Sequence, residues 1–317
     1  MKSLKERWLQ ADGKLLLDGV LTWLSSGSDI ASVGLTKHQD RWDLRGIALP
    51  EHLVVRNATI TNADLSYTTL SGIRWERCRF ENLICTKTNA ERSKFWSCEF
   101  ENVDFVDARL TNVLMNGSLD MVYAGYYKRV KFVNTNLVGT VYTHALFERC
   151  EFLNCKLDKV DFNGARFVDS KFSGKLISVF FRGYSSVNKA YYPDFKPVQN
   201  RMERVDFRDA YMEGVSFIDR IMLGSCLFPE GDDYTILKTN RVQIFTEARG
   251  IIEASWDGVG LRQGLMLIDQ YFLSKRKEGQ DVEFVDRHFL MANPAADSGN
   301  RFFELIRTLN DKWNNAV

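Results

Sequence analysis

Residues 130–177 read VKFVNTNLVGTVYTHALFERCEFLNCKLDKVDFNGARFVDSKFSGKLI, and a large apolar residue returns in this stretch at every fifth position. The series comprises Phe132, Leu137, Tyr142, Phe147, Phe152, Leu157, Phe162, Phe167, Phe172 and Ile177. A smaller residue stands two positions before several of them, as with Ala145, Cys150 and Cys155. Because a helix repeats every ~3.6 residues and a strand every ~2 residues, a period of five indicates a repeat architecture.

The same period extends over most of the chain outside this stretch. It includes Leu65, Leu70, Trp75, Phe80, Phe95, Phe100, Phe105, Leu110 and Met115 on one side, and Phe207, Met212, Phe217, Met222 and Leu227 on the other. If five residues form one side of a square coil, a complete turn takes about 20 residues, and successive turns stack at about 4.8 Å like parallel strands. Residues 20 apart then form columns in the core of a parallel β-solenoid. The predicted structural core residues are Phe80, Phe100, Phe132, Phe152 and Phe172.

Short motifs within this register resemble a known repeat unit. Ala63-Asp64-Leu65, Cys98-Glu99-Phe100 and Val160-Asp161-Phe162 are similar to the A(D/N)Lxx unit of the pentapeptide-repeat family. The resemblance covers roughly residues 44–228. It implies a right-handed quadrilateral β-helix, and thus a mainly β protein. It implies function only as a class, because most members of the family act by binding other molecules.

The register divides the chain into three regions. Residues 1–40 are predicted to form an N-terminal helical cap over the first coil, with an apolar face made by Leu4, Trp8, Leu9, Leu15, Leu16 and Leu24. Residues 41–229 form the solenoid. Residues 230–317 show helical periodicity, and Ile236-Leu237 is expected to lie in the first helix of this region. Several pentapeptide-repeat proteins dimerise through their C-terminal ends, so the resemblance implies a homodimer through these helices.

The register breaks at two places, where loops are expected. Between Met115 and Phe132 its phase slips by two residues, which predicts a small loop that includes Tyr126 and Tyr127. From 178 to 201 the pattern vanishes, which predicts an aromatic loop insert. Loops on a rigid scaffold often carry binding residues. The candidate partner-binding residues are Tyr184, Lys189, Tyr191, Tyr192, Phe195 and Lys196. The alternative is that the loop folds back and packs on a coil face.

Catalysis and cofactor binding find little support in the sequence. The four histidines are scattered, and none has a companion at metal-ligand spacing: His38, His52, His144 and His288. GxSxG, HExxH and Walker motifs are missing from the sequence. Asp286 and His288 would diverge on a helix. We therefore predict a protein that is not an enzyme and needs neither a metal nor another cofactor.

Cysteine usage and hydropathy bear on the compartment. The chain has six cysteines but no CxxC pair, and four of them occupy the small inward position of the repeat. A reducing cytoplasm is the simplest expectation, and it also holds for a secreted effector that reaches a host cytosol. The apolar segment Leu15–Leu24 is short and interrupted by Asp18, so no transmembrane segment is predicted.

The net charge of the chain and the charge of its solenoid distinguish between two possible classes of function. The formal net charge is +1, which predicts no specific nucleic-acid binding. The main prediction is a protein–protein interaction scaffold, adaptor or effector with an unidentified protein partner. The alternative is a protein that interacts with DNA gyrase or another topoisomerase and confers resistance to an inhibitor or toxin by partial DNA mimicry. Mimicry requires a strongly acidic surface, but residues 51–230 contain 24 Lys and Arg against 22 Asp and Glu.

Overall fold

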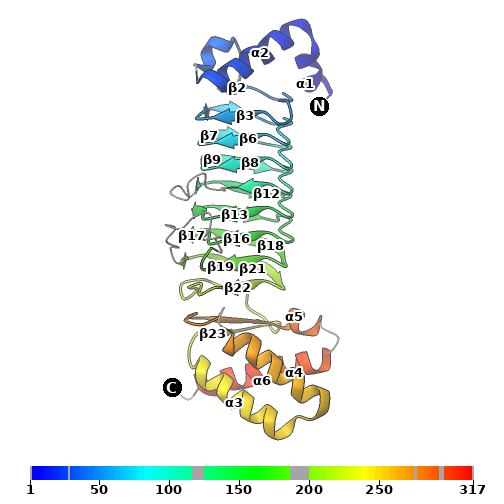
Figure 1. Cartoon of the computed structure of the whole chain (residues 1–317), viewed down its shortest axis with the longest axis vertical. Helices are drawn as coiled ribbons and strands as arrows, with labels where there is room; N and C mark the ends of the chain where they lie inside the picture. The colour runs from blue at the N-terminus through cyan, green and yellow to red at the C-terminus, as the bar shows by residue number, and fades with distance from the viewer. Residues whose placement is uncertain are drawn as a thin grey trace, which may run out of the picture.

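The computed structural model describes residues 2–27, 29–115, 125–185, 200–274, 277–292 and 296–315. These residues form a long rod of stacked coils with helices at both ends (Figure 1). The rod consists of a 14-stranded and an 8-stranded sheet, whose strands pair in parallel apart from one short antiparallel pair at the first coil. The predicted fold, a mainly β parallel solenoid with helical ends, is confirmed.

The 8-stranded sheet forms one side of the rod. Its strands, in spatial order, are β3 (Val54–Arg56), β6 (Arg74–Glu76), β8 (Lys94–Trp96), β10 (Leu114–Met115), β13 (Val141–Thr143), β16 (Asp161–Asn163), β19 (Phe180–Arg182) and β22 (Ser216–Ile218). Arg74 pairs with Lys94, and Trp75 pairs with Phe95, so β6 and β8 are 20 residues apart as the register predicts.

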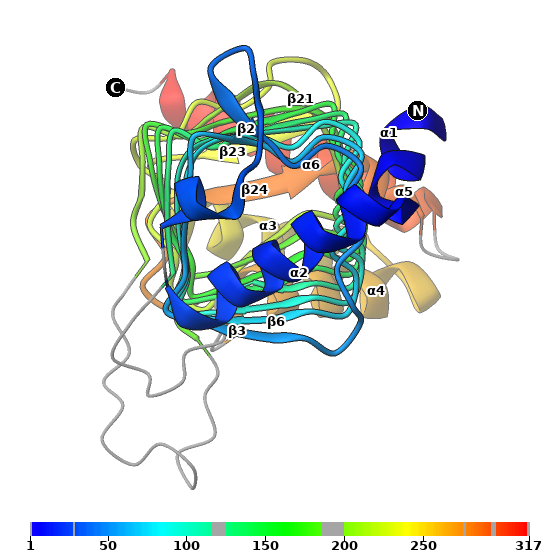
Figure 2. The same cartoon turned by 90° about the horizontal axis from the view of Figure 1, so that it is seen from above.

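The 14-stranded sheet continues around the adjoining sides. Its strands are β1 (Lys37–His38), β2 (Arg41–Asp43), β4 (Thr59–Thr61), β5 (Ala63–Asp64), β7 (Arg79–Ile84), β9 (Glu99–Val106), β11 (Tyr126–Lys128), β12 (Lys131–Val133), β14 (Leu146–Glu148), β15 (Glu151–Leu153), β17 (Arg166–Val168), β18 (Lys171–Ile177), β20 (Met202–Glu203) and β21 (Asp206–Glu213). Viewed along the rod, the coils superpose as a square (Figure 2).

The corners of this square explain why the repeat has five residues. A residue with positive φ recurs at every fifth position, for example Asn57, Asn62, Tyr67, Gly72 and Arg77. This left-handed conformation turns the backbone to the next side of the coil. Gly and Asn adopt it most readily, whereas other residues such as Arg77 adopt it at a cost of about 1–2 kcal/mol.

Stacked aromatic rings fill the centre of the rod. Phe152 is fully buried and lies between Phe132 and Phe172, at ring-centroid distances of 4.8 and 4.6 Å. Phe105 and Phe207 extend this column at 5.2 Å from Phe132 and 5.0 Å from Phe172. Each ring therefore contacts the equivalent ring of the coils above and below it, and offset stacking adds to the hydrophobic burial.

The register shifts by one residue in two places, where the predicted inward residues are wrong. Leu176, rather than Ile177, is fully buried, because the step from Phe172 takes four residues through the corner at Gly174. Near the last coil, the consecutive positive-φ residues Asp219 and Arg220 add one residue to the corner. The buried residues that follow are Leu223 and Phe228 instead of the predicted Met222 and Leu227, and Leu227 is 46% exposed.

Both predicted loops are shorter than expected. Tyr127 is fully buried in β11 and stacks between Phe100 and Phe147 at 5.0 and 4.6 Å, so it belongs to the coil. Phe181, within the insert predicted at 178–201, lies in β19 and stacks on Phe162 at 5.0 Å. Because of the one-residue shift at Leu176, Phe181 does not fall on the five-residue count that starts at Phe172. The repeat is therefore not visible in the sequence at this point.

An N-terminal helical segment closes the first coil. It comprises α1 (Lys2–Glu6), η1 (Arg7–Leu9), α2 (Ala11–Ser26) and η2 (Ile30–Val33), and α2 lies across the open square (Figure 2). Val20, Trp23 and Leu24 are buried against the core of the first coils. Leu9 and Leu15, which were predicted to share this apolar face, are exposed. Leu9 precedes the restart of the helix at Ala11, and Leu15 lies on the side of α2 opposite to Leu24, nine residues away.

An ion-pair cluster fastens this segment to the rod. Asp43, at the end of β2, accepts hydrogen bonds from the guanidinium of Arg7 at 2.6 and 2.8 Å and from Arg45 Nε at 2.9 Å. Burial opposes ionisation of the Asp43 carboxyl, but the hydrogen bonds from Arg45 and Arg7 outweigh it and hold the pKa well below its usual range.

The Asp43 cluster should make the N-terminal cap sensitive to acid. We expect Asp43→Asn to lower the free energy of unfolding at pH 7 by about 3 kcal/mol, since Arg7 loses the carboxylate it contacts and Arg45 keeps only the more distant Asp64, at 3.9 Å. Because the folded-state pKa of Asp43 is lowered, its stabilisation is complete above the unfolded value of about 4 and is lost as the pH falls further. Urea denaturation of both proteins at several pH values should show this difference shrinking below about pH 4. A pH-independent difference would contradict the assignment.

The C-terminal region is a helical domain built on a two-stranded sheet. It contains β23 (Tyr234–Leu237), α3 (Arg241–Ser255), α4 (Gly258–Ile268), the π-helix η3 (Asp269–Leu273), β24 (Glu283–Asp286), α5 (Arg287–Met291) and α6 (Ala296–Asn314). Ile236-Leu237, predicted to be helical, lies in β23, because it pairs antiparallel with β24 next to the last coil. The helices enclose a second core that includes Phe245, Ile252 and Phe302.

Candidate functional site

A hollow opens at one corner of the first coils. Its volume is about 660 Å³, and its lining residues include Ser71, Gly72, Arg74, Arg92 and Lys94. Gly72 forms the corner with a φ of +70°, and an added Cβ would still be 3.9 Å from its nearest neighbour. The missing side chain at this corner therefore leaves room for a group from another molecule. Three cations, Arg74, Arg92 and Lys94, line that room together with two carboxylates, Glu51 and Glu91.

A tryptophan lies beside this hollow on the outer face of the 8-stranded sheet. The Arg74 guanidinium carbon lies 5.3 Å from the centroid of the Trp96 ring, and Lys94 Nζ lies 5.7 Å from it. Arg74 and Lys94 also line the hollow. We call the outer surface formed by Arg56, Arg74, Glu76, Lys94 and Trp96 the Trp96 face. Tryptophan and arginine are the residue types most enriched at the energetic centres of protein interfaces.

Glu76 organises the cations of the Trp96 face. Its carboxylate is largely buried and contacts both Arg56 Nε and Arg74 Nε at 2.8 Å. One carboxylate thus fixes two guanidinium groups, which pre-orients them at the surface. With Lys94 included, the Trp96 face has three cations and one carboxylate, so it attracts negative charge.

The opposite end of the rod meets the C-terminal domain, and hydrogen bonds join the two. The backbone N–H of Gly214 donates to Asp286 at 2.8 Å, that of Met212 to the Tyr234 hydroxyl at 2.9 Å, and that of Leu223 to Asp281 at 2.7 Å. Phe284 lies 5.7 Å from the rings of both Phe217 and Phe228. The domain thus covers the core and satisfies backbone donors that a terminal coil would otherwise leave unpaired.

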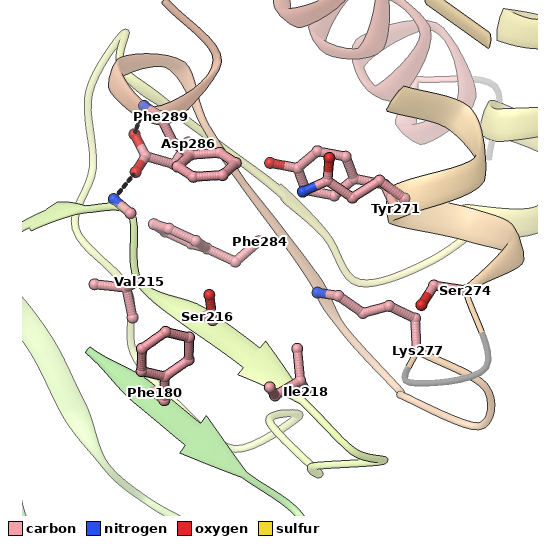
Figure 3. A pocket seen from close by; sticks show the side chains of 12 residues that line it. Phe180, Val215, Ser216, Ile218, Tyr271, Ser274, Lys277, Phe284, Asp286 and Phe289 are labelled. Carbon is pink, nitrogen blue, oxygen red and sulfur yellow. Dashed lines mark hydrogen bonds between the residues drawn. The ribbon is translucent and has the colours of Figure 1, made fainter. Parts of the chain in front are cut away.

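A cavity of about 200 Å³ remains at this junction (Figure 3). Its apolar walls are Phe180, Val215, Ile218, Phe284 and Phe289, and its polar lining includes Ser216, Gln270, Tyr271, Ser274, Lys277 and Asp286. The Asp286 carboxylate also accepts hydrogen bonds from the N–H groups of His288 and Phe289, so it caps the N-terminus of α5. Burial raises the pKa of Asp286, and the backbone hydrogen bonds oppose this increase.

Three charged side chains meet behind this cavity. Glu283 is fully buried, Lys277 Nζ donates to it at 2.6 Å, and the Arg241 guanidinium lies 3.4 Å from its other oxygen. Burial raises the pKa of Glu283, while the two cations oppose this increase. Two cations therefore share one carboxylate.

Comparison with known proteins confirms the repeat. The family model described as pentapeptide repeats matches residues 58–96 and 135–174, with eight copies. This chain is a pentapeptide-repeat protein.

Solved structures with the same kind of repeat are similar to it at low identity. HetL, a pentapeptide repeat protein involved in heterocyst differentiation regulation in the cyanobacterium Nostoc, is 14% identical; the match covers 64% of this chain and 95% of HetL, with a TM-score of 0.36. QnrB1, a plasmid-mediated fluoroquinolone resistance protein, is 16% identical; the match covers 55% of this chain and 90% of QnrB1, with a TM-score of 0.23. No curated protein matches the chain in sequence.

Most of the partner-binding residues predicted for this pentapeptide-repeat protein cannot be placed. Lys189, Tyr191, Tyr192, Phe195 and Lys196 lie outside the described residues. Tyr184 is described and is partly buried. The predicted core residues Phe80, Phe100, Phe132, Phe152 and Phe172 are all buried in the pentapeptide-repeat solenoid.

The junction residues of this pentapeptide-repeat protein were not found from its sequence. Asp286 had been considered only as a possible partner of His288, although an aspartate before a short apolar run is also a helix N-cap signal. Lys277 and Glu283 are six residues apart without a recognisable motif, and Arg241 is more distant still. The Trp96 face was missed because the sequence pattern was used to find inward residues, and Trp96 is the outward neighbour of Phe95.

Metal binding and membrane insertion have no support among the described residues of the pentapeptide-repeat protein. No cluster of three or more metal-ligating side chains occurs among them. His144 is a corner residue with a φ of 54°, and burial lowers its pKa to about 4. Within these residues, no helix combines the length and the apolar character needed to cross a bilayer.

Proposed function

We propose that this protein is a non-enzymatic scaffold that binds an acidic segment of a partner protein at the Trp96 face and the adjoining hollow. The observation that carries this proposal is the position of Trp96, between Arg74 and Lys94 at the edge of the hollow. The hollow can accept a side chain, the exposed part of the Trp96 ring offers apolar contact, and the cations attract carboxylates.

The ends of the rod favour the same interpretation. Segments of the chain itself cover both terminal coils, α2 at one end and the β23–β24 sheet at the other. Partners are therefore expected on the sides of the rod. The buried cysteines, which form no disulfide among the described residues, are consistent with the cytoplasmic location that we expect.

The topoisomerase alternative has less support, because the acidic residues of the rod are mostly paired with basic ones. Glu101 contacts Arg79, Lys128 and Arg129, and this pattern recurs along the rod. Further pairs are Glu151 with Lys131, Asp169 with Arg204, and Asp209 with Lys171. Mimicry of duplex DNA requires a continuous row of negative charge, and such alternation does not supply it.

Self-association through the C-terminal helices stays a prediction. Val259, Met266 and Leu273 are more than half exposed. Val259 and Met266 are seven residues apart in α4, which places these two on one helix face. Sedimentation of wild type and Met266→Glu tests whether this face forms a dimer.

Charge reversal at the Trp96 face tests the proposed scaffold function. The protein and its Lys94→Glu and Trp96→Ala variants would be immobilised and exposed to lysate of the native host over a series of salt concentrations. Lys175→Glu is the matched control, because Lys175 is an exposed cation of β18 on another side of the rod. We expect partner proteins to be retained by wild type and by the control, to be reduced about tenfold or more in both face variants, and to dissociate with salt.

The pull-down can also contradict the proposal. If the face variants and the control retain the same proteins as wild type, the Trp96 face is not the interface. If gyrase subunits are retained and all four proteins inhibit supercoiling equally, the topoisomerase alternative is favoured instead. Circular dichroism of each variant confirms that the coils remain folded.

A further inference from the structure

The junction cavity has the location and size of a small-ligand site. It lies between the outer face of β19 and β22 on one side and η3 and β24 on the other, and binding sites occur preferentially where two parts of a protein meet. Cavities of about 150 Å³ can hold a benzene ring. The volume of about 200 Å³ therefore leaves room for one aromatic ring with a small polar substituent.

Two hydrogen-bond donors point into this cavity. Figure 3 shows the Tyr271 hydroxyl and Lys277 Nζ directed toward its interior, on the side of the C-terminal domain. Tyr271 is only 6% exposed, and it lines the cavity. A tyrosine hydroxyl at the wall of a cavity can donate a hydrogen bond to a ligand inside it. Burial raises the pKa of Tyr271, which keeps the hydroxyl protonated as a donor.

The charges around the cavity differ between its two sides. At the Lys277 side, Arg241 and Lys277 have two positive charges and Glu283 one negative charge, which favours an anionic acceptor there. Asp286 adds one negative charge on the other side of the cavity (Figure 3). An ammonium group has three donors, and Glu283 takes one from Lys277. The other carboxylate, Asp286, accepts hydrogen bonds from the N–H groups of Gly214, His288 and Phe289. These bonds hold it on the side of α5, away from the Lys277 end (Figure 3).

The apolar wall of the cavity favours an apolar group in the rest of the ligand. Phe284, Phe180 and Val215 face the cavity with apolar surface (Figure 3). We propose that this cavity binds a small aromatic carboxylate, with its carboxylate on Lys277 Nζ and the Tyr271 hydroxyl and its ring against Phe284, Phe180 and Val215. The site is independent of the Trp96 face, because it is formed by the last coil and the C-terminal domain.

Benzoate is the probe for this site, with benzamide as its uncharged analogue. Binding to the full chain would be measured by isothermal titration calorimetry and by two-dimensional NMR. Tyr271→Phe removes only the hydroxyl, and we expect it to weaken benzoate binding at least about tenfold, as expected for a hydrogen bond to a charged group. Tyr126→Phe on the rod is the matched control, and it should bind benzoate as wild type does. Ser216→Phe should abolish binding by filling the cavity.

Three outcomes would overturn the proposal. Wild type that fails to bind benzoate contradicts the site itself. Equal affinity of wild type and Tyr271→Phe shows that the hydroxyl does not contact the ligand. Benzamide that binds as tightly as benzoate contradicts the recognition of charge. Melting curves of each variant show whether the C-terminal domain has stayed folded, and the unchanged shifts of rod residues in the NMR spectra locate binding at the junction.

Discussion

Phe152→Ala is expected to lower the free energy of unfolding by about 3–5 kcal/mol, the usual cost of removing a fully buried aromatic ring. Phe152 lies at the middle of its column, stacked on Phe132 and Phe172. Its loss removes ring contacts to the coils above and below, and the neighbouring rings cannot close the gap because β12, β15 and β18 hold their backbones at fixed spacing. Urea denaturation followed by circular dichroism measures the change.

Leu114→Ala is the matched control for Phe152→Ala. Leu114 is a large apolar residue of the same solenoid, but it points outward from β10 and is 40% exposed. Its replacement should cost less than about 1 kcal/mol, since little apolar surface is lost from the core. Equal stability of the two variants would mean that Phe152 does not face the interior and that the 20-residue coil is wrong.

The second large effect is expected at Glu283. Glu283→Ala should lower the free energy of unfolding by about 3–5 kcal/mol, because removal of one member of a buried ion pair leaves uncompensated charge. Here two cations, Arg241 and Lys277, lose the fully buried carboxylate that they share. The loss should be confined to the C-terminal domain, whose tryptophan fluorescence reports it through Trp256 and Trp313.

Glu247→Ala is the control for Glu283→Ala. Glu247 contacts Lys312 at 2.5 Å and the Trp313 indole at 2.9 Å in the same domain, but the pair is at the surface. Exposed ion pairs contribute little to stability, so the loss should be much smaller. If the two variants lose the same stability, the buried group of three charges does not hold the domain together.

The five-residue period was sufficient to predict the coil, because each coil repeats the same local requirement. One large residue per side must point inward, and one residue per corner must turn the backbone. The five-residue period predicted the wrong inward residues where the coil changes length by a single residue, at Leu176 and at Asp219-Arg220. A one-residue change moves every later side chain to a new position, yet it leaves the local composition unchanged.

The candidate sites were harder to predict than the fold. The Trp96 face depends on residues from neighbouring coils, such as Arg74 and Trp96, which approach only when the strands stack. The junction cavity depends on contacts over a longer range still, such as Gly214 with Asp286 and Leu223 with Asp281. No periodicity connects the positions of the junction, whereas Arg56, Glu76 and Trp96 are each 20 residues apart, the length of one coil.

The sequence by itself determined the solenoid, its register over most of the rod and the helical character of both ends. These features follow from side-chain size and backbone conformation repeated every five residues, which are local properties. Only the tertiary structure decided that Tyr234–Leu237 is a strand, that the C-terminal domain closes the last coil, and that Tyr271 and Lys277 share a cavity. These features depend on the pairing of groups that are distant in the sequence. Each of these groups would be unsatisfied without its partner, as the exposed backbone of the terminal coil and the buried charges beside it illustrate.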